Sequence, residues 1–149
     1  MEIKTKNETK TAVVRATVPL RELPGVIGEA YGEIMAYFFR TGLSPTGFPF
    51  VLYGNDDMDA LRVEMGFPVD REVQPEGRVE AGTIPGGEVL SEIHVGPYTE
   101  LERTYTPVMK YIQEQGLAVT EWMYEIYLNS PEDTPETELR TEICFPLKR

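Results

Sequence analysis

The chain of 149 residues carries 14 basic and 25 acidic side chains, for a formal net charge of −11, and 41% of its residues are hydrophobic. These values are typical of one globular domain over residues 1–149, and the acidic balance argues against direct binding of nucleic-acid phosphates. Cys144 is the single cysteine, residues 1–10 are too polar for a signal peptide, and no apolar segment is long enough to span a membrane. We therefore expect a cytoplasmic protein that contacts neither nucleic acid nor membrane.

The first half of the chain predicts a strand, a helix and two further strands, after a polar N-terminal segment over 1–11 that we expect to be frayed at its start. Apolar residues alternate in the first strand, whereas in the helix they recur at spacings of four, three and four residues. Pro24 is suited to the start of that helix and Gly42 to its end. The predicted elements are a strand over 11–18, a helix from 25 or 26 to 41, and strands over 50–53 and 61–69.

The second half repeats this order after an irregular connector over 70–88, which includes one short strand near 78–81. A possible capping box of Thr99 and Glu102 predicts the start of the second helix, and Pro107 predicts a kink or a restart within it. The predicted elements are a strand over 88–95, a helix from 101 that Gly116 ends, and strands over 122–128 and 138–147 on either side of an acidic turn over 129–136.

The strand over 122–128 carries one carboxylate among aromatic residues. Side chains alternate along a strand, so Met123, Glu125 and Tyr127 share one face. The opposite face holds Trp122, Tyr124, Ile126 and Leu128. Charged side chains are rarely buried without a partner. Glu125 therefore lies either on a solvated face or at the floor of a pocket that receives a cation, and periodicity alone does not decide between the two.

The two halves match when the second is shifted back by 74 positions, the separation of Tyr37 and Tyr111. The matched pairs are Ile27 with Leu101, Tyr31 with Tyr105, Ile34 with Val108, Tyr37 with Tyr111, Phe38 with Ile112, Gly42 with Gly116, Phe50 with Tyr124, and Tyr53 with Tyr127. After a four-residue insertion, 64–69 matches 142–147. We infer two βαββ modules, at about 9–69 and 89–149, with chance similarity of two amphipathic helices as the alternative. Two packed modules leave a natural small-ligand site at their pseudo-twofold axis.

Several short motifs recur in a definite order along the chain. In the second half they are Gly96-Pro97-Tyr98, the helix with Tyr105 and Tyr111, Gly116, Glu125-Ile126-Tyr127, the acidic proline-containing turn, Thr141-Glu142-Ile143 and Phe145-Pro146-Leu147. In the first half they are Gly47-Phe48-Pro49-Phe50, Tyr53 and Met65-Gly66-Phe67-Pro68-Val69. Together they resemble the GyrI-like small-molecule-binding family, which supplies the effector-binding domains of some AraC-type and MerR-type transcription regulators.

This resemblance implies an α+β fold in which two SHS2-type βαββ modules form one antiparallel-rich sheet, with the helices on one face and a central ligand cleft. It implies that the acidic residue of the family corresponds to Glu125. Val51 stands at the equivalent position of the first half, so the cleft would hold one such carboxylate. No segment resembles a helix-turn-helix, so the chain is similar to a stand-alone member of the family, which puts direct regulation through DNA binding in doubt.

A lone carboxylate among aromatic rings suits a lipophilic organic cation. Glu125 would supply the charge, and each ring face would add about 0.5–2 kcal/mol as a cation–π contact. A delocalised cation loses less on leaving water than an ammonium ion does. The candidate ligand-binding residues are Glu125, Tyr127, Tyr53, Trp122, Tyr111, Tyr37, Phe48 and Tyr98.

Several of these aromatic residues have a structural alternative. Strict alternation turns Trp122 away from the carboxylate unless a β-bulge re-aims it. Tyr37 and Tyr111 lie at the edges of the helical stripes, where they either pack on the sheet or reach the cleft. Tyr98 either packs or gates at a loop rim, and Phe48 either lines the cleft or packs on the core.

The sequence offers little for a metal ion. His94 is the only histidine, and the acidic turn over 55–59 lacks the length, the glycine and the terminal glutamate of an EF-hand loop. We expect neither a metal site nor a cofactor.

Three kinds of function follow from these features. The first is capture of hydrophobic, cationic small molecules, as a sensor or a sequestering protein. The second is hydrolysis of reactive electrophiles, with Glu125 as base or nucleophile and Tyr127 or Tyr53 as hydrogen-bond donor, as the resemblance to stand-alone family members implies. The third is a gyrase-inhibitor-like contact with a protein partner through the acidic surface, and a partner regulator is also compatible with the resemblance.

Overall fold

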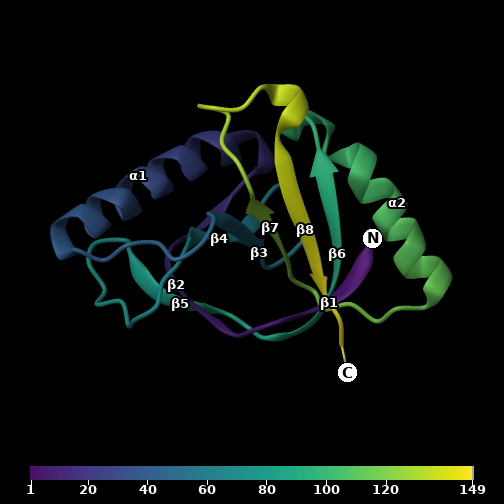
Figure 1. Cartoon of the computed structure of the whole chain (residues 1–149), viewed down its shortest axis with the longest axis horizontal. Helices are drawn as coiled ribbons and strands as arrows, with labels where there is room; N and C mark the ends of the chain where they lie inside the picture. The colour runs from purple at the N-terminus through teal and green to yellow at the C-terminus, as the bar shows by residue number, and fades with distance from the viewer. Residues whose placement is uncertain (149) are drawn as a thin grey trace.

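All eight strands of the computed structural model, which describes residues 1–148, join in one antiparallel sheet. The order across the sheet is β1-β6-β8-β7-β3-β4-β2-β5 (Figure 1). The strands are β1 (Glu2–Lys6), β2 (Thr9–Val18), β3 (Phe50–Tyr53), β4 (Leu61–Pro68), β5 (Glu80–Ile84), β6 (Gly87–Val95), β7 (Met123–Tyr127) and β8 (Arg140–Pro146). The helices are α1 (Leu23–Thr41) and α2 (Glu102–Gln115), and the short 3-10 helices are η1 (Leu20–Glu22), η2 (Tyr98–Glu100) and η3 (Glu136–Glu138).

The predicted α+β fold with two βαββ modules is confirmed. One module is β2-α1-β3-β4 and the other is β6-α2-β7-β8, and β3 pairs with β7 where they meet. The two modules take mirrored places in the strand order, with α1 and α2 on either side of the central strands (Figure 1). This arrangement is the pseudo-twofold symmetry that the sequence repeat predicts.

The register of β3 against β7 places the pseudo-twofold axis. Val51 lies directly opposite Glu125, and these two residues are also equivalent in the repeat. The neighbouring pair Phe50–Ile126 is converted by the same repeat into the pair on the other side, Tyr124–Leu52. The axis therefore passes through the Val51–Glu125 pair, and side chains that surround this pair come in equivalent sets from both modules.

The N-terminal segment forms the edge strand β1 from Glu2 onward, whereas the sequence predicted a frayed start. Residues 2–6 pair with β6 of the second module, whereas β5 of the connector pairs with β2 of the first. The β1–β6 and β2–β5 pairings share one register, because Lys6 pairs with Gly87 and Thr9 pairs with Ile84. The β1–β2 segment therefore runs antiparallel to the β5–β6 segment, and the two segments connect the modules (Figure 1).

The helices begin and end largely where glycine and proline place them. Pro24 lies in the first turn of α1, and Gly42 and Gly116 end the two helices with left-handed φ angles of +75° and +62°. The predicted capping box is wrong: η2 leads into α2, and no side chain caps the start of α2. α2 also continues through Pro107, so the helix does not restart at this residue.

The helices cover one face of the sheet. α1 packs through Ile34 and Phe38 on its own module, and α2 packs through Val108 and Ile112 on the other. The opposite face carries a third apolar cluster, which stays buried without a helix because the sheet curls around it. This cluster contains Val13, Phe50, Ile84, Val89, Tyr124 and Cys144.

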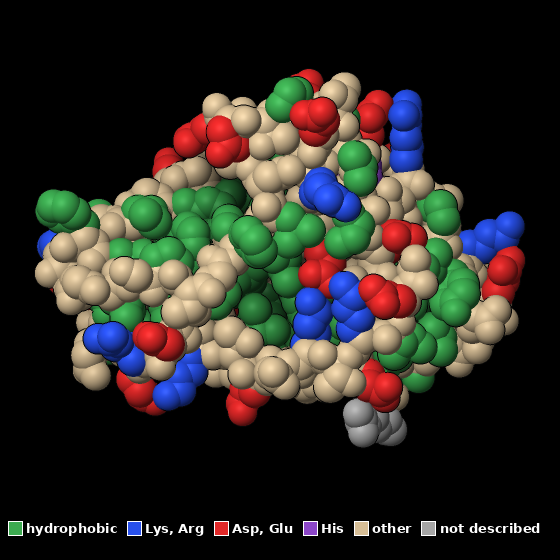
Figure 2. Space-filling view, in the orientation of Figure 1, with side chains coloured by type: hydrophobic (Ala, Val, Ile, Leu, Met, Phe, Trp, Pro, Cys, Tyr) green, Lys and Arg blue, Asp and Glu red, His purple; other side chains and the backbone are tan. Residues whose placement is uncertain are grey.

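The surface in Figure 2 shows acidic and basic side chains interspersed, with hydrophobic side chains gathered in a hollow near its centre. No wide basic area is visible on this face. Among residues 1–148, no helix is both long and apolar enough to cross a membrane.

Gly86 lies between β5 and β6, at the point where this segment crosses the β1–β2 segment. A Cβ atom at Gly86 would lie 2.8 Å from the backbone nitrogen of Glu8, which is closer than real Cβ atoms approach. We expect Gly86→Ala to lower the free energy of unfolding by about 1–3 kcal/mol, because the two backbones must separate. Urea unfolding followed by circular dichroism measures this loss.

Gly25→Ala is the matched control, because nothing lies within 4 Å of a Cβ atom at this helical position. We expect this variant to be as stable as the wild type or slightly more stable. Equal stability of the two variants would contradict the proposed role of the crossing.

Candidate functional site

Glu125 is buried at the junction of the two modules, and its carboxylate accepts three tyrosine hydroxyls. The residue is only 4% exposed. Oε1 accepts from Tyr127 at 2.8 Å and from Tyr53 at 3.5 Å. Oε2 accepts a short hydrogen bond from Tyr105. The buried alternative of the two that the sequence left open for Glu125 is thus the one that the structure adopts.

The tyrosines around the carboxylate follow the pseudo-twofold symmetry. Tyr53 on β3 and Tyr127 on β7 are equivalent, and so are Tyr31 on α1 and Tyr105 on α2. The symmetry is broken where Val51 replaces a carboxylate. Tyr31 has no acid to reach in its own module, and its hydroxyl donates to the backbone oxygen of Phe50 at 2.9 Å.

Burial governs the electrostatics of this site. Removal from water raises the pKa of Glu125, although the three tyrosine hydroxyls and His94 act in the opposite direction. Burial and the neighbouring Glu125 raise the pKa of Tyr53, Tyr105 and Tyr127, so these hydroxyls remain protonated donors. In the described residues 1–148, the hydrogen-bond partners of the carboxylate are hydroxyl groups, and no Lys or Arg neutralises its charge.

Aromatic rings form the surroundings of these hydroxyls. The ring of Tyr98 meets that of Tyr127 edge to face, with centroids 5.6 Å apart. Tyr105 meets Phe145 at 6.1 Å, and at the equivalent place in the first module Tyr31 meets Phe67 at 5.3 Å. The site therefore joins one buried negative charge to several ring faces, the combination that stabilises organic cations.

His94 holds the segment that leads into α2. Its ring is buried, and Nε2 donates to the backbone oxygen of Pro97 at 3.0 Å. Nδ1 forms a hydrogen bond with the hydroxyl of Thr104 at 2.7 Å. These bonds position η2, which carries Tyr98, against the first turn of α2. Among residues 1–148, no group of three or more His, Cys, Asp or Glu side chains is arranged to hold a metal ion.

The structure brings some of the candidate residues together and separates others. Tyr53, Tyr127 and Tyr98 lie at Glu125 or in contact with its partners. Trp122 lies on the opposite face of the sheet, where it stacks on Tyr124 at 5.9 Å.

Three other candidates lie away from the carboxylate. The hydroxyl of Tyr37 donates to the backbone oxygen of Gln74 in the connector, and Tyr111 packs in the apolar cluster under α2. Phe48 is 54% exposed in the loop before β3. Within residues 1–148, no hydrogen bond or ring contact joins any of the three to Glu125 or to the tyrosines that bond to it.

Two site residues were absent from the sequence-based set, namely Tyr105 and Tyr31. Both belong to the helical stripes that face the sheet, and this pattern alone assigns them to the core. The signal that was available is the repeat, because it pairs these two tyrosines across an axis that also relates Val51 to Glu125.

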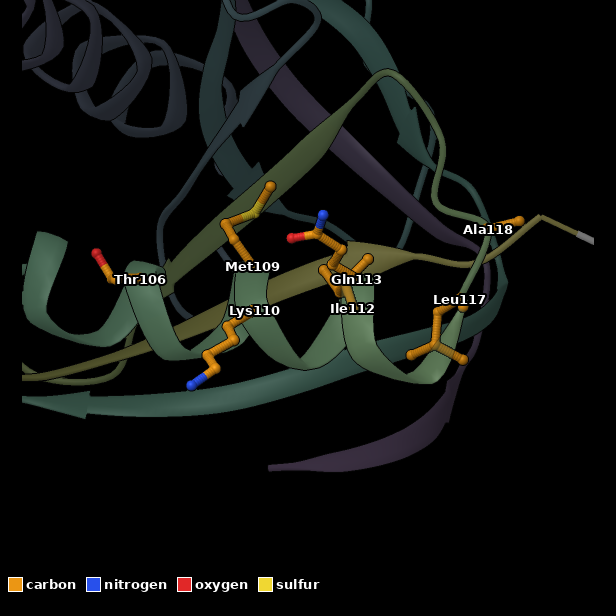
Figure 3. A pocket seen from close by; sticks show the side chains of 8 residues that line it. Thr106, Met109, Lys110, Ile112, Gln113, Leu117 and Ala118 are labelled. Atoms are coloured by element: carbon orange, nitrogen blue, oxygen red, sulfur yellow. The ribbon is translucent and has the colours of Figure 1, made fainter.

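An open surface pocket of about 720 Å³ lies along the second half of α2. Met109 and Gln113 extend from one side of the helix, and Lys110 extends from the other (Figure 3). This pocket contains neither Glu125 nor any tyrosine that bonds to it. The buried charge, rather than this pocket, therefore defines the candidate site.

The sequence matches the model of the GyrI-like small molecule binding domain over residues 1–148. No curated protein matches it significantly. The fold is similar to the isolated C-terminal domain of EcmrR, with a TM-score of 0.82 and 26% identity over 99% of this chain and 96% of that domain. The EcmrR chain in a complex with DNA is also similar, with a TM-score of 0.86 and 24% identity. The match covers 99% of this chain but only 57% of the EcmrR chain.

Two more distant structures share the fold alone. SAV2435, solved bound to tetraphenylphosphonium, has a TM-score of 0.74 and 13% identity over 99% of this chain and 93% of that chain. A hydrolase from Listeria innocua has a TM-score of 0.69 and 16% identity over 99% of this chain and 91% of that chain.

The raised pKa of Glu125 predicts how stability depends on pH. The folded protein holds the Glu125 proton to a higher pH than the unfolded chain does, so ionisation of this residue lowers stability as pH rises through the raised pKa. We therefore expect Glu125→Gln to be more stable than the ligand-free wild type at neutral pH, with a difference that shrinks towards about pH 4. Urea unfolding at several pH values measures this profile.

Glu142→Gln is the control with the opposite sign. Glu142 is also buried, but hydrogen bonds from Ser91 and Lys6 outweigh its burial and lower its pKa. We expect this variant to lose about 1–3 kcal/mol at neutral pH, a loss that fades as pH falls through the lowered pKa. Parallel pH profiles for Glu125→Gln and the wild type would contradict the assignment.

Proposed function

The chain belongs to the GyrI-like family of small molecule binding domains, and from this premise we propose that it binds lipophilic organic cations at Glu125. The observation that carries the proposal is a carboxylate with 4% exposure whose partners are three tyrosine hydroxyls. Such hydrogen bonds keep the empty site satisfied but leave its net charge in place. A cation that enters supplies the missing charge in a medium where Coulomb attraction is strong.

The ring faces favour a particular kind of cation. Tyr98, Tyr105 and Tyr127 offer aromatic surface close to the carboxylate. A delocalised or aryl-substituted cation gives up little hydration and gains both dispersion and cation–π contacts there. The fold is shared with SAV2435, whose structure holds the aryl cation tetraphenylphosphonium, and this likeness supports the same ligand class here.

The role that follows is sensing or sequestration. The chain corresponds in length to the C-terminal domain of EcmrR, a protein that also forms a DNA complex. A domain of this kind passes a ligand signal on when its shape changes with occupancy. In this chain, the elements whose tyrosines converge on Glu125 are β3, β7 and α2, so ligand entry would alter the contacts between the two modules.

Hydrolysis receives less support from the same geometry. A general base must reach the proton that it removes from water or from a nucleophile. Both oxygens of Glu125 already accept hydrogen bonds from tyrosines, and the raised pKa of those tyrosines keeps them protonated, so that they supply no phenolate base. The likeness to the Listeria innocua hydrolase extends to the fold, and binding remains the function that the site favours.

Calorimetric titration with tetraphenylphosphonium and with tetraphenylborate, an anion of the same shape, tests the proposal. We expect the cation to bind and the anion not to bind, because Glu125 attracts only one sign of charge. Glu125→Gln should weaken cation binding by about tenfold or more. Affinity should also fall as pH is lowered through the raised pKa of Glu125.

Glu114→Gln, an exposed acid on α2, is the control for net charge and should bind the cation as the wild type does. Calorimetry is preferred to tryptophan fluorescence because Trp122 lies across the sheet from Glu125. Equal binding of the two ions, or unchanged affinity in Glu125→Gln, would disprove the proposed anchor.

A further inference from the structure

We infer that the site is electrostatically one-sided, so that it selects amphiphilic ions with a single charge, holding the charged end at the α2 half and the apolar body at the α1 half. This inference rests on the proposed function and concerns the class and orientation of the ligand. The axial pair of Val51 and Glu125 differs in charge, and this difference is the starting observation.

Val51 and Glu125 share one backbone environment but differ in charge. They are directly opposite each other on β3 and β7, and side chains in such a pair have Cβ atoms about 4.5–5.5 Å apart. Val51 is fully buried. The tyrosine–phenylalanine contacts of the two modules are equivalent, so the charge of the site comes from the second module alone.

The tyrosine hydroxyls of the two modules differ in the same way as Val51 and Glu125. Tyr105 and Tyr127 direct their hydroxyls at the carboxylate of their own module, and Tyr53 reaches across to it. Tyr31, the counterpart of Tyr105, is held by the backbone oxygen of Phe50. Within residues 1–148, the first module therefore places Val51 and ring faces, and no carboxylate, at the position equivalent to Glu125.

The edges of the two helices differ in the same sense. Tyr31 marks the edge of α1 that faces the axis, since the other edge, with Tyr37, contacts the connector. Gly28 lies one turn before Tyr31 and Gly32 follows it directly, and a Cβ atom at either position would meet nothing within 4 Å. The surface of α1 beside Tyr31 thus carries no side chain at these two positions.

The matching edge of α2 is polar. In the repeat, Glu102 is equivalent to Gly28, and Thr106 is equivalent to Gly32. Glu102 adds an exposed carboxylate one turn before Tyr105. The α2 half therefore carries Glu125 and Glu102 where the α1 half carries Val51 and Gly28, a difference that favours one orientation of an amphiphilic cation.

A pair of ligands tests this selectivity on the wild type. Butyltrimethylammonium carries one charge, and the bis(trimethylammonium) ion with the same butane chain, short enough to match the spacing of Val51 and Glu125, carries two. We expect the single-charged ion to bind at least about tenfold more tightly in calorimetric titrations, because the second ammonium would enter the Val51 half without a counter-charge. Equal or tighter binding of the double-charged ion would overturn the inference while leaving the proposed function intact.

Val51→Glu adds the missing carboxylate and should narrow or reverse this preference. Val51→Gln, which adds the same bulk without charge, should keep the preference of the wild type. An unchanged preference in a folded Val51→Glu variant would count against the inference.

Gly32→Leu and Thr106→Leu serve if the Val51 variants do not fold, because both positions are exposed on helices and leucine favours helix. We expect Gly32→Leu to weaken tetraphenylphosphonium binding by roughly tenfold and Thr106→Leu to weaken it clearly less. Equal losses would overturn the assigned orientation. If the wild type binds none of these cations, the proposed function fails and this inference fails with it.

Discussion

The arrangement of this protein depends on keeping one carboxylate buried without a cation. Glu125 lies where the two modules meet, and three hydroxyls from β3, β7 and α2 must point at it to compensate for lost water. The same three contacts therefore hold the modules in register and hold the second helix over the sheet. His94 also stabilises this arrangement, because its hydrogen bonds to Pro97 and Thr104 fix the segment that precedes Tyr105.

The sequence predicted the repeated modules well because their signals are local. Helical stripes and terminal glycines such as Gly42 and Gly116 depend on neighbouring residues alone. β1 carries no such signal: its alternate residues include Lys4 and Lys6, and its stabilising partner β6 is far away in the sequence. Only the tertiary pairing, with Glu142 beneath the two lysines, makes this polar segment a strand.

The site was predictable to the extent that strand alternation controls it. Alternation correctly separated Glu125 and Tyr127 from Trp122, which packs on the opposite face. Tyr105 was not predicted as a site residue, because a tyrosine in a helical stripe has an apolar ring suited to the core. The pattern does not show which group its hydroxyl contacts. The ring of Tyr105 does pack against Phe145, and its hydroxyl reaches Glu125 as well, so core and site overlap in one residue.

Duplication explains how such a site can change its charge without changing the fold. A residue on a pseudo-twofold axis meets its own counterpart, so the surrounding rings are present twice whatever that residue is. The apolar clusters under α1 and α2 and on the opposite face of the sheet supply most of the packing, whereas the axial pair of Val51 and Glu125 supplies the charge. One side chain therefore sets the electrostatic character of the junction, and the cost of burying it is met by hydroxyls that the repeat already provides.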